Sequence, residues 1–219
     1  MHRTTFLLLL GVTIIGITCW SFNNSMTIDK VEKYKEAIKS KSLSSDALHT
    51  LVRARVIEQA HQLQRYARQY GFDDRYCLLA DMLQPSGNFR FFIFDLEEDA
   101  IVKQGLVAHG IGSETDETVL RFSNTPGSYC TSLGKYKIGK SYNGTYGLAF
   151  KLYGLDPTNS NAYSRNVVLH SYPSVPDYPI TAGSMFLSQG CPTVSPSMLT
   201  AIQQLTHKTT KPILLDIFY

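Results

Sequence analysis

Residues 165–194 read RNVVLHSYPSVPDYPITAGSMFLSQGCPTV, and the rest of the chain can be interpreted outward from them. Asn166–Leu169 is a short run of β-branched and aliphatic residues, which predicts a buried strand that ends at His170. The prolines of the following connection exclude a helix there. Ser188-Gln189-Gly190-Cys191-Pro192 comes next, so a histidine at a strand end is followed by a Gly-Cys pair after a loop.

This pattern has a chemical meaning. A thiol becomes a good nucleophile near neutral pH only when a base takes its proton, and a carbonyl can approach it only where the backbone lacks side-chain bulk. His170 would supply the base, and Gly190 would supply the open backbone. The segment therefore predicts a Cys–His acyl-transfer site on Cys191 and His170.

The same segment resembles the catalytic domain of the L,D-transpeptidases, the YkuD-like murein enzymes, whose signature is a His, a loop and then Ser/Thr-x-Gly-Cys. Leu106–Gly110 (LVAHG) and Phe122–Tyr129 (FSNTPGSY) are similar to stretches of the murein L,D-transpeptidase catalytic domain family. The likeness runs from about residue 89 to the C-terminus. It implies an α+β, mainly β fold: a mixed β-sheet or sandwich, with an N-terminal helical segment and a helix after Cys191.

The resemblance also implies roles. The Cys191 thiolate would attack the carbonyl of the third residue in a peptidoglycan tetrapeptide stem, and His170 would give its proton to the departing D-Ala amine. Backbone N–H groups of Gly190 and Cys191 would bind the oxyanion. Ser188 would orient His170 or the substrate. A second stem's amine would then resolve the thioester into a crosslink, whereas water would make the enzyme a carboxypeptidase.

A further set of residues is expected around the substrate. Arg165 would bind a carboxylate through its fork of donors, with a solvated residue at a strand start as the alternative. His109 would bind substrate or support a neighbour through a hydrogen bond. Asn124 has a turn-forming role as its alternative. The whole set predicted to bind substrate is Arg165, Ser171, Asn124, Ser123, Tyr129 and His109. We expect no metal site and no cofactor, since no ligand spacing or phosphate loop is present.

The chain also departs from the family pattern. Ser171 stands where close relatives usually carry Gly, and Gly183–Leu187 stands where relatives often have an Arg. Gln189 replaces Trp or His, and Thr193 replaces an Asn. These differences leave the nucleophile and base in place but leave the donor stem and the acceptor open.

Length and composition fit one modest catalytic domain. The chain has 219 residues, 18% of them charged, with 13 Tyr and 11 Phe. This composition suits an aromatic-rich β domain better than a disordered chain. The net charge of +3 is too small to indicate nucleic-acid binding.

The N-terminus has the pattern of a targeting segment. His2-Arg3 precedes the apolar run Phe6–Ile17, which is short for a membrane span and typical of a signal-peptide core. Residues 1–21 are therefore expected to be a signal peptide, or an uncleaved anchor that would tether the protein to a membrane. The protein is expected to be exported to the periplasm or cell envelope.

Export affects the interpretation of the cysteines. Without Cys19, the mature chain keeps Cys77, Cys130 and Cys191, an odd number in an oxidising compartment. One arrangement pairs Cys77 with Cys130 and leaves Cys191 free. The alternative is three unpaired cysteines buried in the core.

The remaining sequence predicts helices first and strands later. Residues 22–71 are expected to form a helical segment packed on the catalytic domain, and residues 72–219 the catalytic domain itself. The second helix starts at Ser45 or Asp46 and carries the apolar stripe Leu48, Leu51, Val52, Val56, Ala60, Leu63 and Tyr66. Strands are predicted at 75–83, 89–96, 101–109, 134–139, 148–152 and 212–219, and a helix at 195–205.

Three functions fit these expectations. The first is an exported L,D-transpeptidase. The second is a hydrolase or L,D-carboxypeptidase that uses the same Cys–His site on peptidoglycan. The third is a wall-binding protein that keeps the fold with an idle site.

Overall fold

The computed structural model describes residues 36, 45–115, 119–181 and 185–219. The chain forms two compact units, residues 1–51 and 52–219. The predicted signal segment and, apart from Glu36, the predicted helix near residues 28–38 lie outside the described residues. No helix in the described part of the chain is long and apolar enough to cross a membrane.

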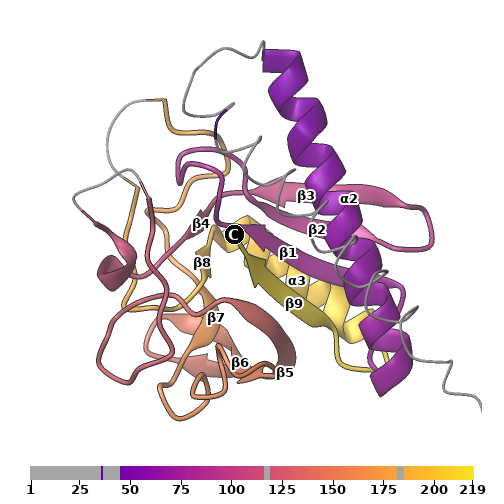
Figure 1. Ribbon diagram of the computed structural model, residues 1–219. Helices are drawn as coiled ribbons and strands as arrows, with labels where there is room; N and C mark the ends of the chain where they lie inside the picture. The colour runs from indigo at the N-terminus through magenta and orange to yellow at the C-terminus, as the bar shows by residue number, and fades with distance from the viewer. Residues whose placement is uncertain (1–35, 37–44, 116–118, 182–184) are drawn as a thin grey trace, which may run out of the picture. The chain divides into compact units, whose positions relative to one another are not determined.

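Within the described residues, nine strands form one mixed sheet in the order β3-β2-β1-β9-β5-β6-β7-β8-β4 (Figure 1). Two pairs are parallel, β1 with β9 and β7 with β8, and the other pairs are antiparallel. The strands are β1 (Tyr76–Asp81), β2 (Phe91–Asp95), β3 (Ala100–Gly105), β4 (Val107–Ala108), β5 (Gly134–Gly144), β6 (Gly147–Gly154), β7 (Val168–Ser171), β8 (Thr193–Val194) and β9 (Leu214–Phe218).

The two edges of this sheet are consecutive in the chain. β3 and β4 are the edge strands, yet only Leu106 separates them. The sheet must therefore curl until its edges lie beside each other. This explains why the single strand predicted at 101–109 is two strands: the chain leaves β2 at Gly105 and joins β8 from Val107. The predicted α+β class with a mixed sheet is confirmed.

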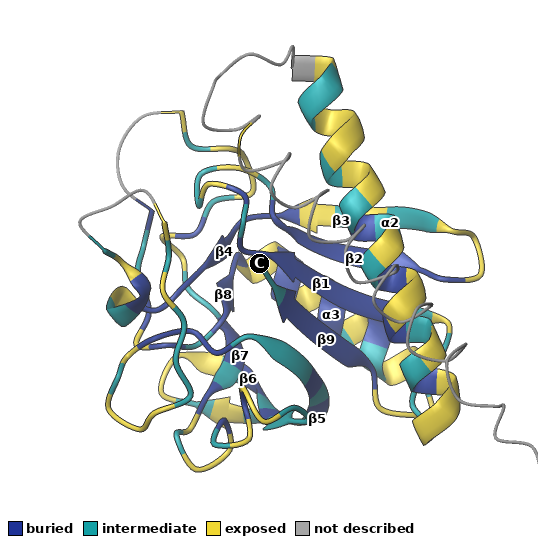
Figure 2. Cartoon of the chain, viewed as in Figure 1, coloured by how far each residue is buried: buried dark blue, intermediate teal, exposed yellow. Residues whose placement is uncertain are grey.

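Helix α2 (Ser45–Tyr70) buries one side against the sheet from Val56 onward. Val56, Ala60 and Leu63 of the predicted stripe are buried, and they pack in a cluster with strand residues such as Leu79 and Phe92. Figure 2 shows the same helix with its other side exposed. The helix thus covers the outer face of β1 and β2.

Helix α3 (Pro196–Lys208) lies in the larger core on the opposite face. Ser195 caps it, because its hydroxyl accepts the Met198 N–H at 3.1 Å. With both faces of β1 and β2 covered, neither strand has a solvent side. Their sequences therefore read as continuous apolar runs, CLLA and FFIF, rather than as alternating patterns.

Of the two arrangements left open for the cysteines, the Cys77–Cys130 disulfide is wrong, since Cys77, Cys130 and Cys191 are all free. The alternative of three unpaired cysteines is correct, although Cys191 is not fully buried. Cys77 is buried in the cluster beneath α2. Cys130 lies in the connection before β5, where its thiol donates to Gly112 O at 3.0 Å. The two buried thiols belong to different parts of the fold, and only Cys191 is partly exposed.

Two polar pairs fix α2 to the sheet beside its apolar contacts. Arg55 forms a two-bond ion pair with Asp81, whose carboxylate is fully buried at the end of β1. One turn along the helix, Gln59 donates to Asp216 of β9 at 2.5 Å. A paired carboxylate tolerates burial, but an unpaired one does not.

We expect Arg55→Ala to reduce the free energy of unfolding by about 3 kcal/mol, because it leaves Asp81 buried without its partner. This value is at the low end for such buried ion pairs, because the positive charge of Arg90 also interacts with Asp81 and would remain in the variant. Urea denaturation measures the change. Arg53→Ala on the exposed side of α2 is the control and should change stability by less than about 0.5 kcal/mol; an equal loss in both variants would contradict the pairing argument.

Candidate functional site

The parallel pairing of β7 with β8 places the segments that carry the predicted nucleophile and base side by side. His170 is level with Thr193 in this register. Cys191 lies two residues before Thr193, outside β8, and the Val168 N–H points at its sulfur at 3.5 Å. Residues two apart on a strand share a face and lie about 6.6 Å apart along it. Val168 and His170 are two apart on β7, so the Cys191 sulfur lies beside the strand that carries His170, one such step before it.

The Cys191 thiol lies in a half-buried position with weak polar contacts. Besides the Val168 N–H, its sulfur approaches Asn166 O at 3.9 Å. Burial raises the pKa of the Cys191 thiol above its ordinary value, and the Val168 hydrogen bond and the positive charge of Arg165 oppose this rise. The resting sulfur is thus a protonated thiol at neutral pH.

His170 is held at both ring nitrogens. Nδ1 lies 3.1 Å from Ser171 O, and Nε2 lies 3.0 Å from Thr193 Oγ1. Because a carbonyl oxygen can only accept, Nδ1 carries the proton and Nε2 accepts from the Thr193 hydroxyl. Burial lowers the pKa of His170, opposed by the Ser171 hydrogen bond. Tyr146, from the β5–β6 turn, stacks on the imidazole with centroids 5.4 Å apart.

The resting pair is therefore a neutral thiol and a neutral imidazole. Thr193, rather than the thiol, is the hydrogen-bond partner of His170 Nε2. The sulfur must turn from the Val168 N–H, and the Thr193 hydroxyl must release Nε2, before the proton can pass. The predicted role of His170 in this arrangement is that of a general base during attack, rather than the partner of a preformed thiolate.

The Ser188 hydroxyl shapes the loop that carries Cys191. It donates to Cys191 O at 2.6 Å and accepts the Gly190 N–H at 3.1 Å. Ser188 thus orients the loop backbone rather than His170. Of the two expected oxyanion donors, Gly190 N–H already has this acceptor, which leaves Cys191 N–H to fill the role. Gly190 has a φ of 112°, a left-handed conformation that favours glycine.

The loop rests on the segment that follows β4. Ser188 N–H donates to His109 O at 2.9 Å, and Ile111 N–H donates to Ser188 O at 2.7 Å. Gly110 lies between them, where a side chain would collide with the backbone of Tyr129 and Gly190. The close approach of Gly110 to the backbone of Gly190 therefore limits where the neighbouring Cys191 can lie.

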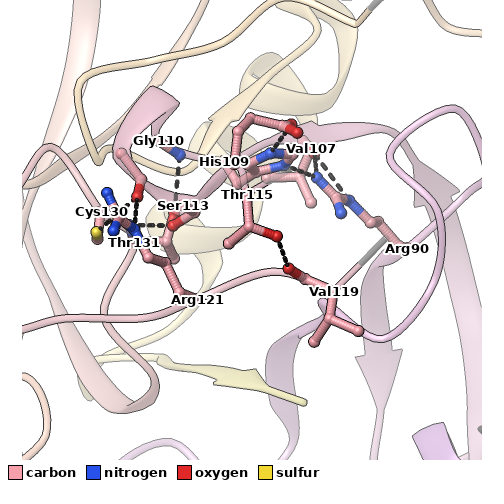
Figure 3. Close-up of polar contacts among 12 residues, drawn as sticks. Arg90, Val107, His109, Gly110, Ser113, Thr115, Val119, Arg121, Cys130 and Thr131 are labelled. Carbon is pink, nitrogen blue, oxygen red and sulfur yellow. Dashed lines mark hydrogen bonds and ion pairs between the residues drawn. The ribbon is translucent and has the colours of Figure 1, made fainter. Parts of the chain in front are cut away.

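The buried side chain of Arg90 hydrogen-bonds to this segment at Val107 and His109 (Figure 3). Arg90 Nη2 donates to Val107 O and to His109 Nδ1, both at 2.7 Å. Since Arg can only donate, His109 Nδ1 is unprotonated, and its Nε2–H donates to Glu114 at 2.6 Å. Burial lowers the pKa of Arg90 to about 10, and burial and Arg90 lower the pKa of His109. The His109 ring is only 2% exposed, so the supporting alternative fits it better than substrate binding.

Arg165 makes its hydrogen bonds within the protein. Nη1 donates to Ser123 O at 3.0 Å and to the Ser132 hydroxyl, and Nη2 donates to Cys130 O at 2.7 Å. These bonds hold the connection before β5 close to Gly190. The guanidinium still acts on the site through its charge, which lowers the pKa of Cys191. Its expected contact with a substrate carboxylate stays a prediction.

The other predicted substrate residues have mixed surroundings. Asn124 ties two loops together, because it donates to Pro157 O at 3.0 Å and accepts the Asn161 N–H at 3.1 Å. The Ser123 hydroxyl accepts the Thr125 N–H in a turn. Tyr129 is 52% exposed, and Ser171 contributes its carbonyl to His170. Their roles toward substrate stay predictions.

Sequence reasoning missed two residues of the site. Thr193 was noted only as a departure from relatives, and its register partner His170 became clear only from the pairing of β7 with β8. The one available signal was its position two residues after Cys191, on the same face of a strand. Tyr146 left no signal, because it reaches His170 from a hairpin turn. In the described part of the chain, no group of three or more His, Cys, Asp or Glu side chains could hold a metal ion.

A sequence profile of the L,D-transpeptidase catalytic domain (YkuD_2) matches residues 48–213. No curated protein sequence matches the chain.

Solved structures give weaker likenesses. The helical cell shape determining protein Pgp2 (K307A mutant) from Campylobacter jejuni has a TM-score of 0.43 at 16% identity, over 67% of this chain and 48% of that one. An L,D-transpeptidase (residues 123–326) from Xylanimonas cellulosilytica DSM 15894 has a TM-score of 0.36 at 15% identity, over 70% of this chain and 68% of that one. An L,D-transpeptidase from Mycobacterium smegmatis has a TM-score of 0.38 at 11% identity, over 65% of this chain and 58% of that one. The chain thus spans about half the length of the Campylobacter protein.

The pKa directions predict how Cys191 reacts with iodoacetamide. Because the resting thiol is protonated, the alkylation rate should keep rising with pH through about 8.5, the ordinary thiol value. Peptide mapping by mass spectrometry after timed quenching measures modification at Cys191 separately from the buried Cys77 and Cys130. A rate that levels off below about pH 7 would mean that the thiol and His170 form an ion pair at rest.

Thr193→Val should slow turnover about threefold to tenfold, the value of one hydrogen bond, because the imidazole loses the donor that orients it. Thr193→Ser keeps the hydroxyl and should stay near the wild-type rate. Thr200→Val, on the exposed side of α3, is the matched control. Steady-state kinetics on any accepted substrate decides the matter: a faster Thr193→Val enzyme would mean that the hydroxyl only competes with the thiol for Nε2.

Proposed function

Because this chain belongs to the L,D-transpeptidase catalytic domain family, we propose that it transfers acyl groups between peptidoglycan stem peptides through a thioester on Cys191. It acts after export, in the periplasm or cell envelope. The apolar segment Phe6–Ile17 behind His2-Arg3 supports export. Stem peptides of peptidoglycan are its substrates.

One observation carries the proposal: the Cys191 sulfur contacts the N–H of Val168, two residues before His170 on β7, while Thr193 of β8 pairs with His170. A thiol and an imidazole so placed can share a proton once a substrate displaces the Thr193 hydroxyl from Nε2. Both side chains come from rigid strands or their immediate flanks, which limits the ways in which they can miss each other.

The reaction proceeds in two balanced halves. The Cys191 sulfur gives its proton to His170 Nε2 and attacks the carbonyl carbon of the third stem residue, with the oxyanion at Cys191 N–H. The C–N bond to the terminal D-Ala breaks, and the imidazolium returns the proton to the D-Ala amine. An amine of a second stem then gives a proton to His170 and attacks the thioester. A new amide bond forms as the C–S bond of the thioester breaks, and the proton passes from the imidazolium to the sulfur.

Purified tetrapeptide muropeptides test the proposal. We expect D-Ala release by the wild-type enzyme, and a loss of at least about a thousandfold in Cys191→Ala and about a hundredfold or more in His170→Ala. His207→Ala, at an exposed position on α3, is the matched histidine control and should keep the wild-type rate. Chromatography of the products separates crosslinked dimers from free tripeptides, which distinguishes transfer from carboxypeptidase action.

A carbapenem provides an independent test of the nucleophile, because its strained carbonyl acylates reactive thiols. The intact mass should rise by one carbapenem in the wild-type enzyme and stay unchanged in Cys191→Ala. A mass shift that survives this substitution would contradict the assignment. No D-Ala release by the wild-type enzyme from any tetrapeptide, together with no carbapenem adduct, would indicate a wall-binding protein with an idle site.

A further inference from the structure

The face of the sheet that carries His170 continues across β6 and β5. Paired residues of neighbouring strands point to the same side of a sheet. Lys151 pairs with Val168, the residue whose N–H contacts the Cys191 sulfur. Tyr153 follows two residues after Lys151 and pairs with Lys137. These side chains therefore share the face that carries His170, and Lys151 begins about 4.8 Å from Val168, on the strand next to β7.

The side chains on this face contact one another as rings and cations. Tyr153 stacks on Tyr163, with centroids 5.1 Å apart and planes at 13°. Lys137 lies over the Tyr153 ring at 4.4 Å. Lys151 lies over the rings of Tyr142 at 4.7 Å and Tyr163 at 5.9 Å. We call Lys137, Tyr142, Lys151, Tyr153 and Tyr163 the tyrosine–lysine face.

The backbone beneath these rings leaves room for them to lie flat. A side chain at Gly139 would come within 2.6 Å of Tyr153 Cε2. Tyr163 forms the outer layer and is 56% exposed. An exposed ring supported by a second ring offers a rigid apolar surface at little entropic cost.

This part of the chain has an excess of positive charge. Residues 122–176 contain the bases Lys135, Lys137, Lys140, Lys151 and Arg165, and Asp156 is the single acid. Asp156 pairs with Lys135 at 2.9 Å, and Arg165 is bonded to the connection before β5. Among the described residues, no carboxylate forms an ion pair with Lys137 or Lys151, and the ammonium groups of both lie over tyrosine rings. The tyrosine–lysine face is therefore cationic as well as aromatic.

We propose that the tyrosine–lysine face binds the polymeric part of the substrate, a glycan strand with carboxylate-bearing stems. Sugar rings stack on Tyr163, and stem carboxylates pair with Lys137 and Lys151. The inference rests on the proposed function and extends it. It follows from the chemistry of the face and from its continuity with the site. A group bound at Lys151 is one strand from Val168, whose N–H contacts the Cys191 sulfur on the other side of β7. Such a group is too far to touch the reacting carbonyl and close enough to be part of the same extended substrate.

A binding experiment separates this inference from catalysis. In a Cys191→Ala background, which cannot turn over substrate, the protein should sediment with purified, insoluble peptidoglycan. The double substitution Lys137→Ala/Tyr163→Ala should weaken this binding about fivefold to twentyfold, and 0.5 M salt should remove part of what remains. Tyr70→Ala/Lys208→Ala, an exposed pair from other surfaces, is the matched control and should bind as before.

Three further readouts complete the test. Thermal melts must show that both double variants fold. The single substitution Tyr163→Phe should keep the binding that Lys137→Ala/Tyr163→Ala loses, since stacking needs only the ring. Soluble glycan fragments should compete for binding better than poly-glutamate at equal charge. Unchanged binding of Lys137→Ala/Tyr163→Ala, or equal competition by poly-glutamate, would overturn the proposal. A wild-type enzyme that binds the polymer through this face but releases no D-Ala would instead refute the proposed function alone.

Discussion

The candidate site depends on one backbone constraint, the parallel pairing of β7 with β8. Parallel strands keep equal spacing, so two residues that precede a pair lie level with each other. The His170–Thr193 pair brings the chain just before β8 alongside the start of β7, where the Cys191 sulfur meets the Val168 N–H. A shift of the register by one residue would turn either the thiol or the imidazole into the core.

The surrounding structure serves to hold this register. β8 has two residues and cannot fix itself, so β4 covers it on the other side. The segment after β4 then hydrogen-bonds to Ser188, and Arg90 holds that segment from within the core. Because β3 and β4 are nearly continuous, the support reaches back to the half of the sheet that α2 covers. A buried arginine with a lowered pKa is acceptable there because it donates to several acceptors.

Much of this organisation could be predicted from the sequence. The apolar stripe of α2 from Val56 onward and the position of α3 follow from helical periodicity and a Ser-Pro start. The nucleophile and base followed from spacing within one segment. The local signals failed where distant segments meet. The predicted strand at 101–109 is two strands because the chain passes from one edge of the sheet to the other. The Cys77–Cys130 disulfide was wrong because an odd number of cysteines gives no information on the distance between any two of them. Thr193 and the bonds of Arg165 likewise depend on pairings that no local pattern contains.

The central claim is that His170 and Cys191 exchange a proton across this strand pair after Thr193 releases the imidazole. A crystal structure of the enzyme with a stem-peptide acyl group trapped on Cys191 tests it most directly. The account predicts that His170 Nδ1 still lies at Ser171 O, while Nε2 has left the Thr193 hydroxyl and faces the thioester. An acylated sulfur beyond the reach of Nε2, with Thr193 still bonded to the imidazole, would contradict it.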